Sequence, residues 1–496
     1  MALDVVTPGS PGWWLARCHQ KLIARQPRLR RLFARYEGNP WEPDWLATAP
    51  DAAKRFYRAS RTSFATMIVK APLHRLRVTS IATADGGGDL GDTDAWRVWR
   101  AAGMLSEAPE VCRTLLIAGD GYVILGVDDT GPYATSEDPR QVVTIHDPIR
   151  QSRVRAAAKF FTDTDTGVDY GYLYLPGRRF VARSPEGAAP ALGVTDSART
   201  RAAFAPSTWV WDETAGGSDG EAFPAGMDDF VGVVRFRNDE GVGEFERHED
   251  ILYRLDHVIL QGMVIATMQA FRQRAIKVDP ADMPDVDPFT GEAINYDEVL
   301  SADPGALWKL PLTAELWESG QVDLNGILAM AEKEMQRLSA VTFTPLSMFN
   351  SDAVNQSAAG AELVKEGLTD KVSALQERLE QPYAMVASGL LRLSGFTDRA
   401  GLDEIKVGWS PAVRYTLNER AQAAMAGKTS EVPWRTRMLE FWQFSPEQIA
   451  QAESERMSDA LLFPAAVAAA GGSAAEAPTT SGADPAGAAA DGGTGG

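Results

Sequence analysis

The sequence predicts an α+β fold that is mainly helical and ends in a disordered tail. Short runs of strand-forming residues gather in the first half of the chain, and long stretches with apolar residues at helical spacing dominate the second half. The 496 residues are 45% hydrophobic and 23% charged, an ordinary balance for a protein that can bury a large core. At roughly 100–200 residues per domain, this length leaves room for about three domains.

The N-terminal region is expected to be helical after a flexible start at residues 1–12. Residues 13–36 form a predicted helix with a break or kink at Pro27, because proline removes a helix hydrogen bond. The apolar face of this helix carries Trp14, Leu22, Leu29, Leu32 and Phe33. A second predicted helix covers residues 51–70 and begins at Asp51 as its N-terminal cap.

The middle of the chain is expected to be rich in strands, after two further helices that end near residue 118. Turn residues bound most of the runs with strand character. These runs are 76–82, 121–128, 142–147, 156–163, 170–176, 179–184 and 231–238. Before the last of them, residues 185–229 are rich in glycine, proline, alanine and aspartate, and they predict a long exposed loop or insertion.

Three long helices are expected in the second half. Residues 246–274 predict one long helix of roughly 43 Å, at about 1.5 Å per residue. An acidic, loop-rich stretch at 277–304 and a short strand at 306–312 precede a second helix over 324–340. The third helix, which Pro382 should kink, has apolar residues three and four positions apart: Leu368, Val372, Leu375, Leu379, Tyr383, Val386, Leu390 and Leu393. Spacing alone fits a core helix and a seam between subunits equally well.

The charge balance argues against a protein whose main task is to grip nucleic acid tightly. The formal net charge is −18, although residues 1–84 hold 14 basic and five acidic residues. This basic segment fits a solvated helix face, contact with nucleic acid, or pairing with the acidic surface of a neighbouring copy. Two cysteines (Cys18 and Cys112), no signal peptide and no apolar run of membrane-spanning length predict a soluble intracellular protein.

No catalytic, metal or cofactor site is predicted. The GKT sequence that starts at Gly427 lacks the opening glycine of a phosphate-binding loop, since Gln422 stands there. Thr416 and Glu419 instead predict a capping box, with Gly427 ending that helix. Residues 163–169 predict a hairpin turn, because a calcium loop would need a glutamate at its twelfth position. The five histidines are dispersed, and no nucleophile elbow is present.

Several local phrases, in their order along the chain, resemble one known family. They are RYEGNP (35–40), RASRTSFATMIVKAPLHRLRV (58–78), LLIAGDGYVILGVDDTG (115–131), FTPLSMFNSDAVNQSAAGAELVKEGLTDKV (343–372), VGWSPAVRYTLNERAQAAMAG (407–427) and FSPEQIAQAESER (444–456). With the long helix from Glu246, residues 13–460 resemble the portal proteins (head–tail connectors) of tailed double-stranded-DNA bacteriophages, in particular the family seen in phages of actinobacteria. EFERHEDI at 244–251 and the insertion at 185–229 depart from that pattern.

The resemblance implies a portal-like subunit with an α/β wing, long stem helices, a small clip and a helical crown. The implied regions are the wing at 13–245, a stem helix at 246–274, the clip at 275–323, a second stem helix at 324–342, a tunnel loop at 343–360, and the returning wing helix with the crown at 361–460. Residues 464–496, almost all Ala, Gly, Ser, Thr, Pro and acidic residues, are a predicted disordered tail.

The resemblance also implies an assembly. A homo-oligomeric ring, a dodecamer in that family, would sit at one capsid vertex of a virion made in the bacterial host cytoplasm. Double-stranded DNA would pass through it during packaging and ejection. The chain itself would have no catalytic activity, because a separate terminase motor hydrolyses ATP. The terminase large subunit, a head-completion or adaptor protein, and the major capsid or scaffolding protein are implied partners, and a membrane is not.

Two groups of residues are expected to carry these contacts. The clip acids Asp282, Asp285 and Asp287 are predicted to dock partner proteins. The polar residues predicted to line the DNA channel are Ser347, Asn350, Ser351, Asn355, Gln356 and Ser357. Two alternative functions stay open. One is another virion structural or scaffold protein, which would form oligomers without a channel; the other is a nucleic-acid-processing ATPase, whose phosphate, metal and nucleophile motifs are missing.

Overall fold

The computed structural model describes residues 2–40, 42–84, 91–184, 209–224, 226–270, 274–279, 286, 289–294, 314–318, 323–349, 358–413, 415–444 and 446–462. Over these residues the chain is a mixture of helix and sheet in which helix predominates, as the sequence predicts. It divides into two units, Met1–Arg414 and Tyr415–Gly496. The predicted disordered tail at 464–496 lies outside the described residues.

The first residues of the larger unit are an ordered segment, so the expectation of a flexible start is wrong. Leu3 is buried, and the Ser10 hydroxyl caps the first helix by accepting a hydrogen bond from the Trp13 amide at 3.1 Å. The helix that follows, α1 (Pro11–Tyr36), continues past Pro27 without a break.

The helix predicted over residues 51–70 is interrupted. The helices in this region are α2 (Asp44–Ala47), α3 (Asp51–Ser60) and α4 (Phe64–Leu73). The backbone is extended at Arg61, and the Ser63 hydroxyl donates a hydrogen bond to the Tyr36 carbonyl at 2.7 Å. This tertiary contact fixes a turn where the local composition favours a helix. Asp51 is the first residue of α3 and does not cap it.

Most strands of the larger unit lie in two antiparallel sheets. The smaller contains β2 (Asp120–Asp128), β3 (Gly131–Glu137) and β10 (Val233–Arg237), in the order β10-β2-β3. The larger contains β4 (Val142–His146), β5 (Val154–Thr162), β6 (Asp169–Leu175), β7 (Arg178–Arg183), β8 (Val210–Trp211) and β9 (Glu221–Ala222). β1 (Val78–Ala82) pairs separately with β13 (Lys406–Trp409). These strands confirm the seven predicted up to residue 238 and add β3, β8, β9 and β13.

The connection between β5 and β6 is the predicted hairpin turn at 163–169, in which the Asp163 amide donates to the Val168 carbonyl at 2.9 Å. In contrast, part of the exposed loop predicted at 185–229 is packed structure. Residues 209–224 contain β8 and β9, and the Trp209 and Trp211 side chains are buried. Two tryptophans bury enough apolar area to hold a segment whose composition otherwise resembles a loop. Residues 185–208 lie outside the described part of the chain.

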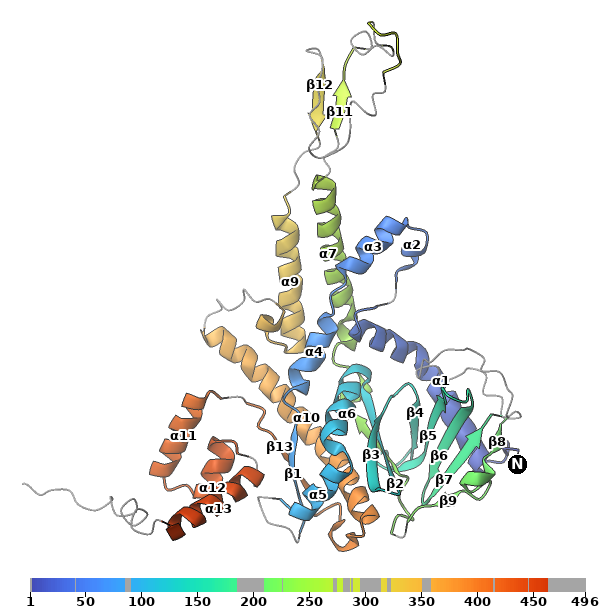
Figure 1. The fold of residues 1–496 in the computed structure, drawn as a ribbon, viewed down its shortest axis with the longest axis vertical. Helices are drawn as coiled ribbons and strands as arrows, with labels where there is room; N and C mark the ends of the chain where they lie inside the picture. The colour runs from blue at the N-terminus through green and yellow to red at the C-terminus, as the bar shows by residue number, and fades with distance from the viewer. Residues whose placement is uncertain are drawn as a thin grey trace, which may run out of the picture. The chain divides into compact units, whose positions relative to one another are not determined.

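Helices and sheets of the larger unit form layers (Figure 1). The helices α5 (Thr93–Ala101), α6 (Met104–Ala118) and α10 (Ala358–Leu393) pack on one face of the β10-β2-β3 sheet. The opposite face of that sheet, with Tyr122 and Ile124, meets the six-stranded sheet. The far face of the six-stranded sheet is covered by α1 through Leu15, Cys18 and Leu22. We refer to this layered part as the body.

The periodic run in α10 is part of the core of its own subunit. Its apolar positions Leu368, Val372, Leu375, Leu379, Tyr383, Val386 and Leu390 are all buried within the chain. The interpretation of this run as a seam between subunits is therefore wrong. The helix also continues past Pro382, as α1 does past its own proline.

The smaller unit is helical. Its helices are α11 (Leu417–Thr429), α12 (Trp434–Thr436), the π-helical turn η10 (Arg437–Phe441) and α13 (Pro446–Leu462). The predicted capping box is confirmed, because Thr416 and Glu419 exchange side-chain and backbone hydrogen bonds. Gly427 does not end α11, which continues to Thr429. A Cβ atom at Gly427 would lie 2.3 Å from the Phe441 ring, so glycine allows the close approach of that ring.

Candidate functional site

Two helices of the larger unit form an antiparallel pair that carries the candidate site. They are α7 (Glu249–Ala270), entered through the short η5 (Glu246–His248), and α9 (Asn325–Thr342). Gly262 of α7 lies opposite Ile327 of α9, and Arg254 forms an ion pair with Glu334 at 2.9 Å. Figure 1 shows the helices side by side, with β11 and β12 beyond their ends. Both helices were predicted, although α7 ends four residues before the expected boundary.

The inner half of this pair is held to the body by α1. Successive arginines of α1 form ion pairs with acidic residues at the start of α7, and Arg25 pairs with β2. The pairs are Arg25–Asp120, Arg28–Glu246, Arg31–Glu249 and Arg35–Asp256. For these four arginines, nucleic-acid contact and pairing with another copy are therefore wrong interpretations, whereas Arg31, which is 52% exposed, still lies on a solvated face. These four of the 14 basic residues in the N-terminal segment neutralise acids more than 90 residues away in sequence.

Burial changes the ionisation of the acids in this contact. Burial raises the pKa of Asp256, and the Arg35 guanidinium acts in the opposite direction. Burial likewise raises the pKa of Glu249, against the opposing effect of Arg31. The cation beside each carboxylate favours its charged form against the effect of burial. The junction between α1 and α7 therefore depends on these charges.

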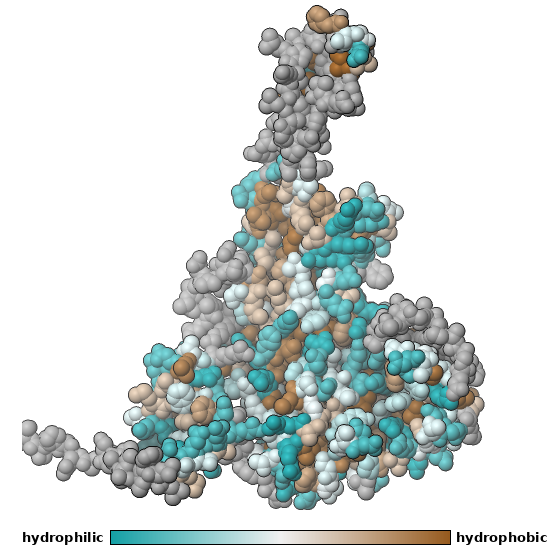
Figure 2. All heavy atoms as spheres, viewed as in Figure 1, coloured by the Kyte–Doolittle hydropathy of each residue, from teal (hydrophilic) through white to brown (hydrophobic). Residues whose placement is uncertain are grey.

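The outer half of the pair is different. Among the α7 side chains that the structure describes, none after Leu260 is buried, and α9 has no buried side chain before Glu334. Apolar side chains here are exposed: Val264 at 39%, Leu328 at 61% and Met330 at 49%. Figure 2 shows apolar atoms at the surface of this half. Two helices alone cannot cover such residues, which is typical of a surface that another protein buries.

The ends of α7 and α9 connect to a two-stranded sheet of β11 (Arg274–Lys277) and β12 (Glu315–Glu318). In the described residues each strand pairs only with the other, and Leu316 and Trp317 are exposed. A lone pair of strands is marginally stable in water. The predicted clip begins here, but Asp282, Asp285 and Asp287 lie outside the described residues, as does the strand predicted at 306–312.

The predicted tunnel loop is only partly described. Ser347 lies in the short η7 (Leu346–Met348) and is exposed. Asn350, Ser351, Asn355, Gln356 and Ser357 lie outside the described residues. The segment that leads to them is anchored, because the Ser339 hydroxyl donates to the Thr344 carbonyl at 2.7 Å and the Phe349 ring lies 5.9 Å from that of Phe64. The channel-lining role of these six residues stays a prediction.

The described residues offer neither a metal site nor a membrane-spanning helix. No cluster of three or more histidine, cysteine, aspartate or glutamate side chains is arranged there to hold a metal ion. Likewise, none of the described helices has both the length and the apolar character needed to cross a membrane.

Comparisons with known proteins give the following picture. No known family model and no curated protein matches the sequence. Among solved structures, the chain is similar to one from the virion of a native gene transfer agent particle, at 14% identity and a TM-score of 0.42 over 80% of this chain and 94% of that chain. It is also similar to one from the neck of an empty gene transfer agent particle, at 11% identity and a TM-score of 0.40 over the same shares. Values this low do not establish a common fold or function.

Proposed function

We propose that the chain is a portal protein, one subunit of a ring-shaped channel at the capsid vertex of a phage-like virion. Double-stranded DNA would pass through this ring when the capsid is filled and again when the DNA is ejected. In this proposal the chain has no catalytic activity and needs no cofactor, and a terminase motor supplies the ATP hydrolysis. Two observations support the proposal: the order of the sequence phrases along the chain, and the exposed apolar surface of the α7–α9 pair.

The observation that carries the proposal is the exposed apolar surface on the outer half of α7 and α9. Burying a leucine side chain fully contributes about 1.5–3 kcal/mol, and the exposed Leu328 realises little of this within one subunit. The same pair from a neighbouring copy would cover Val264, Leu328 and Met330. Head-to-tail contacts of this kind close into a ring when the rotation between copies is right.

The charge of the chain supports a conduit rather than a DNA-gripping protein. Each copy carries a net charge of −18, and four arginines of the basic N-terminal segment are paired inside the subunit. A ring with this charge would bind the duplex weakly and allow it to slide. Neutral polar residues such as Ser347 would contribute single hydrogen bonds of about 1 kcal/mol to passing phosphates.

The β11–β12 end is the proposed docking point for the packaging machinery. Its exposed Trp317 fits a protein interface, where tryptophan is enriched. Within the described part of the chain β11 and β12 pair only with each other, and a free strand edge accepts another strand. The acids Asp282, Asp285 and Asp287 would add attraction for a basic partner. The terminase large subunit would dock here first and a head-completion protein later, while the body would contact the capsid or scaffolding protein.

The test is the oligomeric state and shape of the purified full-length chain. We expect mass photometry to find one large oligomer and negative-stain electron microscopy to find rings with a central channel. The double variant Leu328→Asp/Met330→Asp should remain folded by circular dichroism, because both side chains are exposed, but it should fail to form rings. Ile149→Asp is the matched control, since Ile149 is an equally apolar residue that is 95% exposed outside the helix pair.

Three outcomes would contradict the proposal. A wild-type chain that stays monomeric would exclude a ring. Oligomers without a channel would favour a different virion structural or scaffold protein. Rings that survive the double variant would show that the copies meet elsewhere than on the outer half of α7 and α9.

A further inference from the structure

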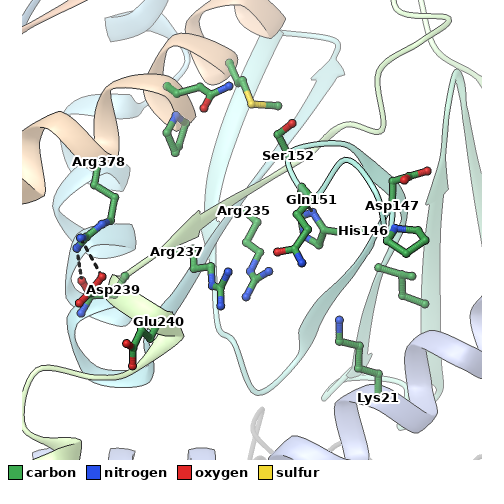
Figure 3. Close-up of a pocket in the computed structure, with 16 residues that line it drawn as sticks. Lys21, His146, Asp147, Gln151, Ser152, Arg235, Arg237, Asp239, Glu240 and Arg378 are labelled. Carbon is green, nitrogen blue, oxygen red and sulfur yellow. Dashed lines mark hydrogen bonds and ion pairs between the residues drawn. The ribbon is translucent and has the colours of Figure 1, made fainter.

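The body contains a hollow of about 650 Å³ that no local sequence pattern predicted. It lies between α1, the turn after β4, the end of β10, and α10. Figure 3 shows the Lys21 ammonium entering it from α1, and the guanidinium groups of Arg235 and Arg237 entering it from β10. Because strand side chains alternate between faces, residues two positions apart on β10 project to the same side. Three cations therefore face one space.

These cations are incompletely neutralised. The Lys21 ammonium donates to the Thr144 carbonyl at 2.9 Å, a contact that brings no negative charge. Arg235 shares the carboxylate of Asp120 with Arg25, so one anion serves two guanidinium groups. Arg237 has no ion pair or hydrogen bond with the residues that the structure describes. Among the described residues, the carboxylate of Asp120 is the one acid that pairs with any of Lys21, Arg25, Arg235 and Arg237. The other acids of the lining, Asp147, Asp239 and Glu240, pair with Arg155, Arg378 and Arg247.

Two titratable groups beside the hollow have lowered pKa values. Burial and the nearby Arg235 lower the pKa of His146 to about 4. Burial and the same arginine also lower the pKa of Lys21. His146 is therefore neutral at pH 7, with its Nδ1 donating to the Gln151 carbonyl at 2.7 Å. Burial alone would disfavour a charge of either sign, so only the contribution of Arg235 to the two shifts reports a positive potential, and that potential favours an anion.

Acidic residues at the rim of the hollow limit the kind of anion that can bind there. Asp147 stands on one side of the cations, and Asp239 and Glu240 stand on the other (Figure 3). Duplex DNA carries one negative charge per roughly 1.7 Å of its axis, so a bound duplex would meet these carboxylates as well as the cations. A ligand whose negative charge is confined to a short stretch avoids that repulsion.

The size and the remaining lining favour a peptide over a single small anion. A volume of about 650 Å³ is in the range of roughly 300–1,000 Å³ typical of sites for drug-sized molecules, and it is much larger than one phosphate ion needs. Ile145, Pro382 and Met385 add apolar wall beside the cations. We propose that this hollow binds an acidic peptide segment of a partner protein, with its carboxylates on Lys21, Arg235 and Arg237. This proposal does not depend on the ring.

The test is fluorescence anisotropy with a fluorescein-labelled peptide of four Asp-Glu repeats and the full-length protein at pH 7 and low salt. We expect binding that weakens as salt rises. Arg237→Gln should weaken it roughly tenfold, the size of effect expected for one charge-assisted hydrogen bond. This variant should fold normally, because Arg237 is exposed. Arg97→Gln is the matched control: Arg97 is an exposed arginine of α5 outside the hollow, paired with Asp94 at 3.0 Å.

Several results would overturn the proposal. One is equal binding by the wild type and Arg237→Gln, and another is equal loss in the Arg97→Gln control. Binding of a peptide of four Asn-Gln repeats with the same affinity would show that charge is irrelevant. A 20-base-pair duplex that binds as tightly as the acidic peptide, and loses affinity with Arg237→Gln, would identify a nucleic-acid site. Complete displacement of the peptide by equimolar inorganic phosphate would identify a small-anion site.

Discussion

Apolar side chains are buried in the core of the body, whereas several are exposed in the outer half of the α7–α9 pair. In the body, Tyr383 is buried among the rings of Trp99, Phe236 and Trp409, with centroid distances of 5.8, 4.7 and 5.5 Å. Its hydroxyl is satisfied as well, because it donates to the Ala108 carbonyl at 2.9 Å. In the outer half, the apolar side chains of Val264, Leu328 and Met330 remain in contact with water.

The contrast exists within a single helix. Leu338 of α9 is fully buried, whereas Leu328 of the same helix is 61% exposed, ten residues or about 15 Å earlier along its axis. The inner end therefore belongs to the core of the subunit, and the outer end is available to a partner. This division means that the body can gain its stability within one subunit, whereas in the proposed ring the outer helices would gain theirs when copies meet.

The largest expected effect is the difference in unfolding free energy between substitutions at two tryptophans. Trp99 is 1% exposed and Trp317 is 58% exposed. We expect Trp99→Ala to lower the free energy of unfolding by about 4 kcal/mol, because it removes a large buried ring and leaves a cavity. Trp317→Ala should change it by less than about 0.5 kcal/mol. Urea denaturation of dilute protein, followed by circular dichroism, would measure both.

The two variants should have the reverse order of effects on partner binding. Under the proposed portal function, Trp317→Ala should weaken capture of the terminase large subunit while the body stays folded. If Trp317→Ala destabilised the dilute chain as much as Trp99→Ala, the strand pair would belong to the core and the division between the two regions would be wrong.

A second prediction tests the junction between the regions. Arg35 and Asp256 form an ion pair whose side chains are 13% and 5% exposed. We expect Arg35→Met to lower the free energy of unfolding by about 3 kcal/mol at pH 7, because it leaves a buried carboxylate without a counter-charge. Arg31→Met is the matched control one turn earlier on α1. Its pair with Glu249 is 52% and 23% exposed, so the loss should stay below about 1 kcal/mol.

The pH dependence of Arg35→Met has a definite sign. Burial already raises the pKa of Asp256 above its value in the unfolded chain, and removal of Arg35 should raise it further. The folded variant then binds a proton more readily than the unfolded chain does. Its deficit relative to the wild type should therefore shrink as the pH falls from 7 through the raised pKa toward about 4. Equal deficits at pH 7 and pH 4.5 would show that Asp256 is not the cause.

The comparison also explains which parts of the structure could be predicted from the sequence. Local sequence was sufficient for the apolar stripe of α10, whose helical spacing matches its burial, and for β2, whose apolar run without alternation is typical of a buried strand. It failed where a distant contact decides the outcome. The break between α3 and α4 depends on Ser63 reaching the Tyr36 carbonyl, and composition alone favours one helix there.

Prediction of the candidate site from local sequence has the same limit. The helices α7 and α9 were predictable from spacing, but the ion pairs that fix α7 join residues 218 and 221 positions apart. The convergence of Lys21 with Arg235 and Arg237 likewise arises only when α1 and β10 pack in one body. Charge counts revealed the basic N-terminal segment, but not which acids it neutralises. Pairing across such separations is a property of the folded chain, not of any window of its sequence.

The smallest expected effect lies within the body, beside the hollow. The pKa of His146 is about 4 in the folded protein, below the ordinary 6.5, because of burial and the nearby Arg235. A histidine with a depressed pKa contributes stability above about pH 6.5 and loses it as the pH falls toward 4. Solvent screening limits this contribution to about 2 kcal/mol. We therefore expect His146→Gln to lose less stability than the wild type between pH 7 and pH 4.5, as measured by urea denaturation.

Lys21→Met should raise the His146 pKa in an NMR titration, because it removes one of the charges that lower it. Two results would contradict this prediction: equal losses of stability in the wild type and His146→Gln, and an unchanged His146 pKa in Lys21→Met. Together they would show that the hollow carries no positive potential.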